Sequence, residues 1–410
     1  MKYLALFLFS CFTFNAFSQC DYSSGRFAVA SEKKLLYGIL PDYRDLQDSL
    51  FLDIYYPIGS PEIQKPLVIW AFGGGFFQGA REDFAAVCSD LASRGIVSAT
   101  IDYRIGFDGP YPTLGPPFSY DVAEIIRAGY RGATDMKGAI RFLKAKSNQY
   151  GIDLDRIWIG GASAGSIVAL NAAFLDLPSE KPKETGAISP IGTKIRSDLG
   201  PIEGVLNQNG YDSKIQGVFN IFGALLDTNA INTDNKIAVF SYHQIQDPVV
   251  PCDARPPYYN YTFISNNYPV AYGTCVITER LKNIGMDPLY YETWIYQGNQ
   301  HATHDNEAVI DFLLQQAKPF FCKTITNSST ETSQPLDAVY IIPNLVSDYF
   351  EIKNAPDQFG FTIFNAAGQI LTHENRTTNH LIQVSNYKSG VYFMTIYNGS
   401  SQKTLRWIKY

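Results

Sequence analysis

Short apolar runs rich in β-branched and aromatic residues recur between about residues 50 and 323, and each is apolar on both faces. They lie at 66–72, 96–104, 156–162, 217–224, 236–243 and 289–298. Strands buried on both faces are typical of a mainly parallel sheet. In a helical stretch between them, 133–147, Met136, Ile140 and Leu143 recur at helical spacing. The alternation predicts an α/β fold whose helices cover both faces of the sheet.

The pattern changes after Cys322. Residues 324–335 form a polar, Ser/Thr-rich linker, and beyond it every segment is a short strand followed by a turn, with Gly368 and Gly390 in turns. Residues 336–410 are therefore predicted to form a second domain, a small all-β sandwich.

The first residues predict a secretory signal peptide, 1–18, with Lys2 ahead of an apolar stretch and small residues after it. Cys20 raises the alternative of a lipoprotein, but Phe17 and Gln19 before it make a poor lipidation site. No later apolar run reaches the ~18 residues that a spanning helix needs. We expect an exported protein without a transmembrane segment, whose first folded domain is 19–323.

Composition narrows the possible partners and cofactors. Of 410 residues 46% are apolar, and the net charge of −6 offers no basic surface for nucleic acid. Cys252 and Cys275 flank a long Pro- and Tyr-rich loop and are the expected disulfide pair. No Cys-x-x-Cys or His-rich spacing supports a metal site.

Two glycine-rich segments carry the candidate chemistry. The segment 161–165, Gly-Ala-Ser-Ala-Gly, directly follows a predicted buried strand and precedes an apolar helix, which is the setting of a nucleophile elbow around Ser163. Three consecutive glycines, 73–75, follow an earlier strand, where backbone N–H groups can turn toward an oxyanion. The bland alternative for the second segment is a flexible loop.

With these segments in view, residues 50–323 resemble the α/β-hydrolase fold, in particular its carboxylesterase and lipase branch. The stretches that carry the resemblance, in order, are 52–57, 68–79, 101–106 and 133–166. One departure is Phe72, where the branch commonly has His before the three glycines. The resemblance implies that Ser163 is a nucleophile and that Gly74, Gly75 and the N–H of Ala164 form an oxyanion hole.

The base and acid should then follow Ser163 in the chain order acid, His. Of five histidines, His373 and His380 lie in the second domain, and His243 precedes the best acid and is expected to pack at a strand end. His301 and His304 remain, after the last apolar strand. We favour His301, because His304 lies where a helix is expected to begin at 306–317.

Asp247 is the expected acid. It lies just past the strand 236–243 and resembles the family's His-Gly-x-x-Asp-x-x-Val-Pro stretch, with Gln244 where Gly is usual. The bland alternative is an Asp that caps its own turn. Other acids at permissible places are Asp227, Asp234, Asp253 and Asp305.

These residues predict acyl transfer by a Ser-His-Asp triad through an acyl-enzyme, with no metal or organic cofactor. The substrate is a small-molecule or polysaccharide ester, such as a short acyl or aryl ester. The tyrosines of loop 257–272 and the insert 107–121 either border the site or pack their own loops. Alternatives in other classes are a catalytically silent binding or adhesion protein on the same scaffold, or a serine peptidase.

The second domain resembles the type IX secretion sorting domains of gram-negative bacteria. The resemblance spans about 336–410 and rests on Pro343-Asn344, the turn at Ala367-Gly368, and Gly390-Val391-Tyr392 ahead of a basic last strand. It implies outer-membrane secretion machinery as a partner, with export through the periplasm to the surface or the medium. A generic carbohydrate- or protein-binding sandwich is the open alternative.

Overall fold

The protein is described from a computed structural model, which places residues 22, 24–110, 114–191, 194–304, 316–327, 336–356, 359–377, 380–398 and 401–410. The predicted signal peptide, 1–18, and most of the helix expected at 306–317 lie outside these residues.

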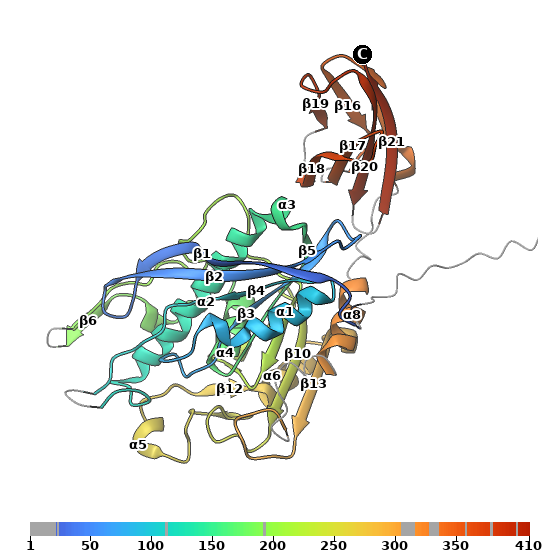
Figure 1. The fold of residues 1–410 in the computed structure, drawn as a ribbon. Helices are drawn as coiled ribbons and strands as arrows, with labels where there is room; N and C mark the ends of the chain where they lie inside the picture. The colour runs from blue at the N-terminus through green and yellow to red at the C-terminus, as the bar shows by residue number, and fades with distance from the viewer. Residues whose placement is uncertain are drawn as a thin grey trace, which may run out of the picture.

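An eight-stranded sheet forms the centre of the first domain (Figure 1). Its strands, in spatial order, are β1 (Ala28–Pro41), β2 (Gln47–Ile58), β4 (Val97–Ile101), β3 (Lys65–Ala71), β5 (Ile152–Ala162), β8 (Gly217–Ile221), β10 (Ala238–Gln244) and β13 (Tyr291–Tyr296). Neighbours from β4 to β13 are parallel, whereas β1 and β2 are antiparallel additions. The predicted α/β-hydrolase architecture, with a mainly parallel sheet, is confirmed.

Helices pack on this sheet, and short strands in the connecting loops form two further small sheets. The helices are α1 (Ala85–Ser93), α2 (Val122–Lys144), α3 (Ser147–Tyr150), α4 (Ala164–Phe174), α5 (Thr262–Ser265), α6 (Thr274–Asn283) and α8 (Lys318–Asn327). The small strands are β6 (Ile188–Ile191), β7 (Lys194–Arg196), β9 (Ala224–Leu225), β11 (Ala254–Arg255) and β12 (Ala271–Gly273). Helix α4 packs against β5 and β8, so the residue joining β5 to α4 is held at the centre of the sheet.

The core explains why these apolar runs are strands. Every residue of β4, β8 and β10 is buried, as expected for strands covered on both faces. Trp70 of β3 and Trp158 of β5 each pack on Phe219 of β8, and Phe321 of α8 packs against Trp158. Burial of these large rings anchors the middle of the sheet.

Helix α2 is longer than the predicted helix 133–147. It begins at Val122, where the Asp121 side chain caps it by accepting from the Glu124 N–H. Its basic residues are buried rather than solvated: Lys137 donates to the carbonyls of Leu175 and Ile202. The loops after α4 cover this face of the helix, which a helical pattern alone does not reveal.

The chain from residue 336 has sheets and a hydrophobic core of its own. Its strands are β14 (Tyr340–Ile342), β15 (Leu345–Val346), β16 (Tyr349–Lys353), β17 (Phe359–Asn365), β18 (Ile370–Thr377), β19 (Leu381–Gln383), β20 (Gly390–Asn398) and β21 (Ser401–Lys409). They form two sheets around Trp407 and Phe350, whose rings lie 5.1 Å apart.

One boundary differs from expectation. Helix α8 continues to Asn327 and so includes the first four residues of the predicted linker 324–335. Thr324 and Ile325 are buried, because they face the core of the first domain despite the polar sequence around them.

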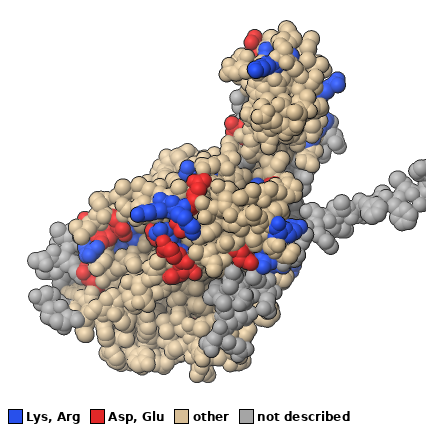
Figure 2. All heavy atoms as spheres, viewed as in Figure 1, with Lys and Arg blue, Asp and Glu red and all other residues tan. Residues whose placement is uncertain are grey.

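On the face seen in Figure 2, charged side chains of both signs lie close together in a band across the first domain, and large areas of that face carry no charge. That distribution agrees with the modest net charge of −6.

Candidate active site

Ser163 lies in the sharp turn between β5 and α4. Its backbone adopts φ 55° and ψ −124°, a conformation that costs free energy for any residue except glycine. The Ser163 N–H donates to the Ile221 carbonyl of β8 at 2.9 Å, which fixes the turn against the sheet. A strained serine between a strand and a helix is the geometry of a nucleophile elbow.

Close backbone packing explains the two glycines that flank this turn. A Cβ at Gly165 would lie 2.1 Å from the Ala71 carbonyl oxygen, and one at Gly161 would lie 2.4 Å from the Gly165 carbonyl carbon. Both obstacles are backbone atoms, which cannot rotate away. The Gly-x-Ser-x-Gly spacing therefore lets the elbow approach β3 closely enough to bring Ser163 beside the glycine loop.

The structure brings Ser163, His301 and Asp247 together. His301 Nε2 lies 2.7 Å from Ser163 Oγ, and His301 Nδ1 lies 2.7 Å from Asp247 Oδ2. Because an ionised carboxylate can only accept, Nδ1 carries the proton and Nε2 accepts from the serine hydroxyl. The edge of the His301 ring also contacts Phe222, at 4.9 Å between centroids.

The competing residues lie elsewhere. The His304 ring stacks on Tyr296, 5.0 Å away, and packs against Tyr242. Asp253 pairs with Arg255, and Asp227 caps a short turn at Asn229. Asp234 is an exposed loop residue, and Asp305 lies outside the described residues.

Asp247 is buried at the end of β10, with 1% of its surface exposed. Its Oδ1 accepts from the N–H groups of Val249 at 2.8 Å and Val250 at 3.1 Å, which leaves Oδ2 for His301. Burial raises the pKa of Asp247, but hydrogen bonds from His243 and His301 outweigh burial and hold the pKa below its ordinary value. The Asp247 carboxylate therefore caps its own turn through Oδ1 and also accepts from His301 through Oδ2.

The glycine loop lies beside the elbow. Gly74 and Gly75 have φ of +106° and +62°, and a Cβ at Gly73 would lie 3.4 Å from Ser163 Cβ. Gly75 and Ala164 line the same pocket as Ser163, whereas the Gly74 carbonyl accepts from the N–H groups of the turn that follows. Phe72 stacks on Tyr103 at 4.5 Å and is buried, so the aromatic residue at this position serves the core.

An apolar pocket opens in front of Ser163. It is lined from α2 by Ile125 and Gly129, from α4 by Ala164 and Ile167, and otherwise by Gly75, Phe76, Ala224, Leu225, Leu226, Val249, Val250, Pro257, Tyr258, Tyr268, Pro269 and Ala271. None of these side chains carries a charge. The α2 residues of the pocket were not predicted, because the helix was expected to begin only at 133 and begins at Val122.

The two loops expected near the site are joined. Tyr268 Oη donates to the Pro117 carbonyl at 2.7 Å, and Asn267 Nδ2 donates to the Ser119 carbonyl at 2.9 Å. Tyr258 and Tyr268 line the pocket with their rings packed edge to face, whereas Tyr261 is 52% exposed. Tyrosines of this loop therefore include both pocket-lining and solvent-facing residues.

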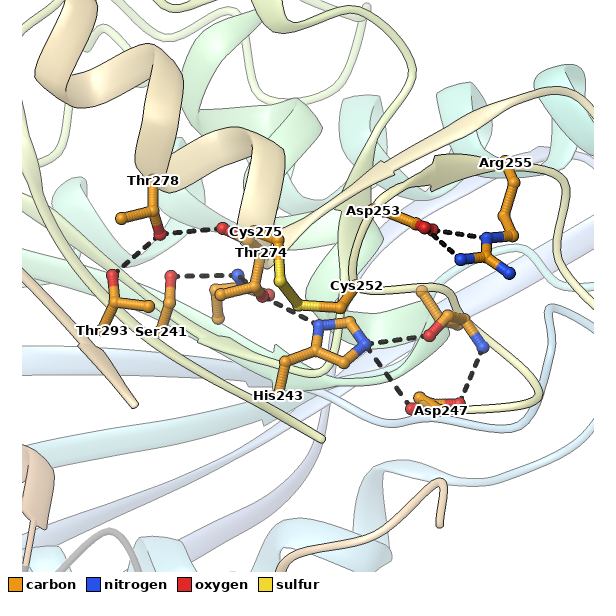
Figure 3. The surroundings of a disulfide bond; sticks show 12 residues. Ser241, His243, Asp247, Cys252, Asp253, Arg255, Thr274, Cys275, Thr278 and Thr293 are labelled. Carbon is orange, nitrogen blue, oxygen red and sulfur yellow. Dashed lines mark hydrogen bonds and ion pairs between the residues drawn. A yellow bond between two sulfur atoms is a disulfide. The ribbon is translucent and has the colours of Figure 1, made fainter. Parts of the chain in front are cut away.

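The expected Cys252–Cys275 disulfide is present near Asp247 (Figure 3). Cys88 is a buried free thiol. Within the described ranges, no cluster of three or more His, Cys, Asp or Glu side chains could hold a metal ion. Over the same residues, none of the helices has the length and apolarity to cross a bilayer.

Comparison with known proteins gives two family matches. Residues 16–193 match the carboxylesterase family, and residues 340–410 match the secretion system C-terminal sorting domain. The first match contains the glycine loop and Ser163 but ends before Asp247 and His301.

Individual relatives match over parts of their length. They include the fumonisin B1 esterase of Sphingopyxis macrogoltabida, 28% identical over 171 residues, which are 38% of this chain and 29% of the relative. The para-nitrobenzyl esterase of Bacillus subtilis is 28% identical over 151 residues, 36% of this chain and 28% of the relative. The chain thus spans less than a third of the length of these relatives.

A solved esterase from Thermogutta terrifontis, with propionate bound, has 19% identity and a TM-score of 0.43, over 71% of this chain and 93% of that one. The two family matches confirm the predicted resemblance: an N-terminal region of this chain matches the carboxylesterase family, and its C-terminal region matches the secretion system C-terminal sorting domain.

Proposed function

We propose that the protein is a secreted carboxylic ester hydrolase in which Ser163 attacks the ester carbonyl. The observation that carries this proposal is the continuous pair of 2.7 Å hydrogen bonds from Ser163 through His301 to a buried Asp247. The family match over 16–193 supports ester hydrolysis as the reaction class.

In the proposed first step, His301 Nε2 takes the proton of Ser163 as Oγ bonds to the ester carbonyl carbon. Asp247 accepts from Nδ1–H and stabilises the imidazolium that forms. His301 then gives its proton to the leaving alcohol, and the acyl group stays on Ser163. Water, activated by the same imidazole, releases the acid and restores the hydroxyl.

The N–H groups of Gly75 and Ala164 are the proposed donors to the tetrahedral oxyanion, with Gly74 as the third candidate. Ala164 is the first residue of α4, where a helix N–H has no partner within the helix. Gly75 lines the same pocket. Donors held in place before the reaction need no reorganisation when charge develops.

The pocket favours an uncharged substrate. Its walls are aliphatic side chains, the Phe76 ring and two tyrosine rings, so it fits an acyl or aryl group and offers no cation for a carboxylate or phosphate. Short acyl or aryl esters, free or attached to a polysaccharide, are the proposed substrates. A prolyl or other serine peptidase would be revealed by peptide rather than ester turnover.

The test of the proposed function compares three variants on an aryl acetate. Ser163→Ala and His301→Ala should each lower turnover by about three orders of magnitude or more. His304→Ala is the matched control, because its ring packs on Tyr296 and not on Ser163. Equal turnover by Ser163→Ala and the unmodified chain would refute Ser163 as the nucleophile, and no turnover by the unmodified chain would favour a catalytically silent binding protein.

Export is the second part of the proposal. The match of residues 340–410 to a secretion sorting domain supports delivery across the outer membrane, after passage through the periplasm, to the surface or medium. A chain ending at Asn327, the last residue of α8, should keep its specific activity but stay inside the native host. Normal export of that shortened chain would refute the sorting role.

A further inference from the structure

A buried network of polar side chains lies beside Asp247. It contains Asn220 of β8, Ser241 and His243 of β10, and Thr274 at the start of α6, all at most 1% exposed. Figure 3 shows His243 between Thr274 and Asp247, next to the Cys252–Cys275 disulfide. Fully buried polar groups of this kind persist only when their hydrogen bonds are satisfied.

One backbone N–H group determines which atoms donate and which accept in the hydrogen bonds of this network. The Gly223 N–H can only donate, and it lies 2.9 Å from Asn220 Oδ1, which also accepts from Ser166 Oγ at 2.7 Å. The other end of the amide is therefore NH₂, and it donates to Thr274 Oγ1 at 2.9 Å and to Ser241 Oγ at 3.0 Å.

The same reasoning fixes the tautomer of His243. Because Thr274 Oγ1 accepts from Asn220, its own hydroxyl hydrogen is free to point at His243 Nδ1, 2.9 Å away. Nδ1 then accepts and Nε2 carries the proton. That N–H lies 2.9 Å from the Val250 carbonyl oxygen and 3.5 Å from Asp247 Oδ2.

We propose that His243 is a positioning residue for the triad, held in its Nε2–H tautomer by Asn220 and Thr274. It binds the carbonyl of Val250, the residue whose N–H donates to Asp247 Oδ1, and it approaches the oxygen that accepts from His301. The inference rests on the proposed function, because it concerns the orientation of the same Asp247 carboxylate.

Two further contacts make the network rigid. The disulfide joins Cys275, directly after Thr274, to Cys252, two residues after Val250, and the Cys275 N–H donates to the Cys252 carbonyl at 2.8 Å. Ser166 lies one turn into α4 from Ser163, so the network also reaches the helix that begins at the nucleophile. The same set of buried groups therefore contacts both the helix that begins at Ser163 and the residues around Asp247.

The decisive variant is Thr274→Val, which keeps the shape of the side chain and removes the hydroxyl. We expect kcat on an aryl acetate to fall about five- to twentyfold with KM unchanged, because the variant loses the two buried hydrogen bonds through which Asn220 and Thr274 orient His243. Thr274→Ser restores the hydroxyl and should recover most of the lost kcat.

Thr278→Val is the matched control. Thr278 lies one turn later on α6 and bonds to Thr293 and to the Thr274 carbonyl, without touching His243 (Figure 3). It should leave kcat unchanged while removing a comparable hydroxyl. His243→Leu should lower kcat further, and Thr274→Val keeps the test decisive if His243→Leu does not fold.

An unchanged kcat in Thr274→Val, or an equal loss in Thr278→Val, would overturn the inference even if Ser163-dependent turnover is normal. Failure of Thr274→Ser to recover activity would overturn it as well. Absence of any Ser163-dependent turnover in the unmodified chain would instead refute the proposed function, and this inference with it.

Discussion

The two halves of the candidate site are positioned by different physical means. Ser163 is held by backbone: a strained turn, two glycines packed against carbonyl groups, and one backbone hydrogen bond to β8. Asp247 contacts the side chains of His301 and His243, in addition to two backbone N–H groups, and His243 is in turn oriented by Thr274 next to a disulfide. The position of Ser163 thus depends on backbone atoms, whereas the position of Asp247 depends on particular side chains.

This difference determines how each half should fail. A close backbone contact tolerates no added atom, so a single substitution at the elbow should abolish most of the activity. A hydrogen-bonded network loses one interaction at a time, so change around Asp247 should act in steps.

The largest effect is expected at the elbow. Gly165→Ala places a methyl group about 2.1 Å from the Ala71 carbonyl oxygen, so either Ser163 moves or the domain does not fold. We expect esterase activity to fall at least ~100-fold, measured on protein that passes size-exclusion chromatography. Gly390→Ala is the control, because its Cβ would have no neighbour closer than 3.7 Å. Normal activity of Gly165→Ala would contradict the backbone account.

The pocket between the two halves offers the next test. A Cβ at Gly129 would meet only the Phe76 ring, at 3.7 Å, so a longer side chain would extend into the pocket. Gly129→Leu should lower kcat/KM for octanoyl relative to acetyl aryl esters about tenfold or more, whereas Gly129→Ala should change that ratio little. An equal loss on both esters would mean that the pocket does not receive the acyl chain.

Removal of the disulfide should loosen the loop around Asp247 and leave the elbow at Ser163 unchanged. The Cys252 to Cys275 link closes a loop with a sequence separation of 23, so the double variant to Ser should lose about 3 kcal/mol of unfolding free energy. Activity should become more heat-labile, and kcat at low temperature should fall less than in Gly165→Ala. Thermal unfolding followed by residual activity measures both. An unchanged melting temperature would refute the stabilising role of the disulfide.

The smallest expected effect is a change in the free energy of unfolding at acidic pH. The pKa of Asp247 in the folded chain is below its ordinary 3.8, so its ionised form adds stability above that value, and this contribution is lost as pH falls through the folded pKa. The difference in unfolding free energy between the unmodified chain and Asp247→Asn should therefore be constant at neutral pH and shrink below about pH 4. Urea titrations at several pH values test this. A difference that grows on acidification would mean that the pKa is raised instead.

The sequence could reveal the half that depends on backbone. Close packing at an elbow requires glycine, so Gly161 and Gly165 leave a readable spacing around Ser163, and the strand before them is a readable apolar run. Chain order and a position after apolar strands predict His301 and Asp247 as the base and the acid.

The sequence could not reveal the half that depends on side chains. Asn220, His243 and Thr274 come from three separate elements, and no local spacing relates them. The β1–β2 hairpin was missed because many β1 side chains are exposed, so it lacks an apolar pattern. Helix α2 was placed too late because Gly129 and Gly132 and its many buried charges obscure the helical periodicity before 133.

The central claim is that Ser163, activated by His301, forms a covalent intermediate. The most direct measurement is mass spectrometry of peptides after treatment with a dialkyl aryl phosphate, which traps an activated serine. The account predicts a single dialkylphosphoryl adduct on the peptide that contains Ser163. The adduct should be absent in Ser163→Ala, strongly slowed in His301→Ala and normal in His304→Ala. Labelling that persists in Ser163→Ala, or an adduct on another residue, would contradict the account.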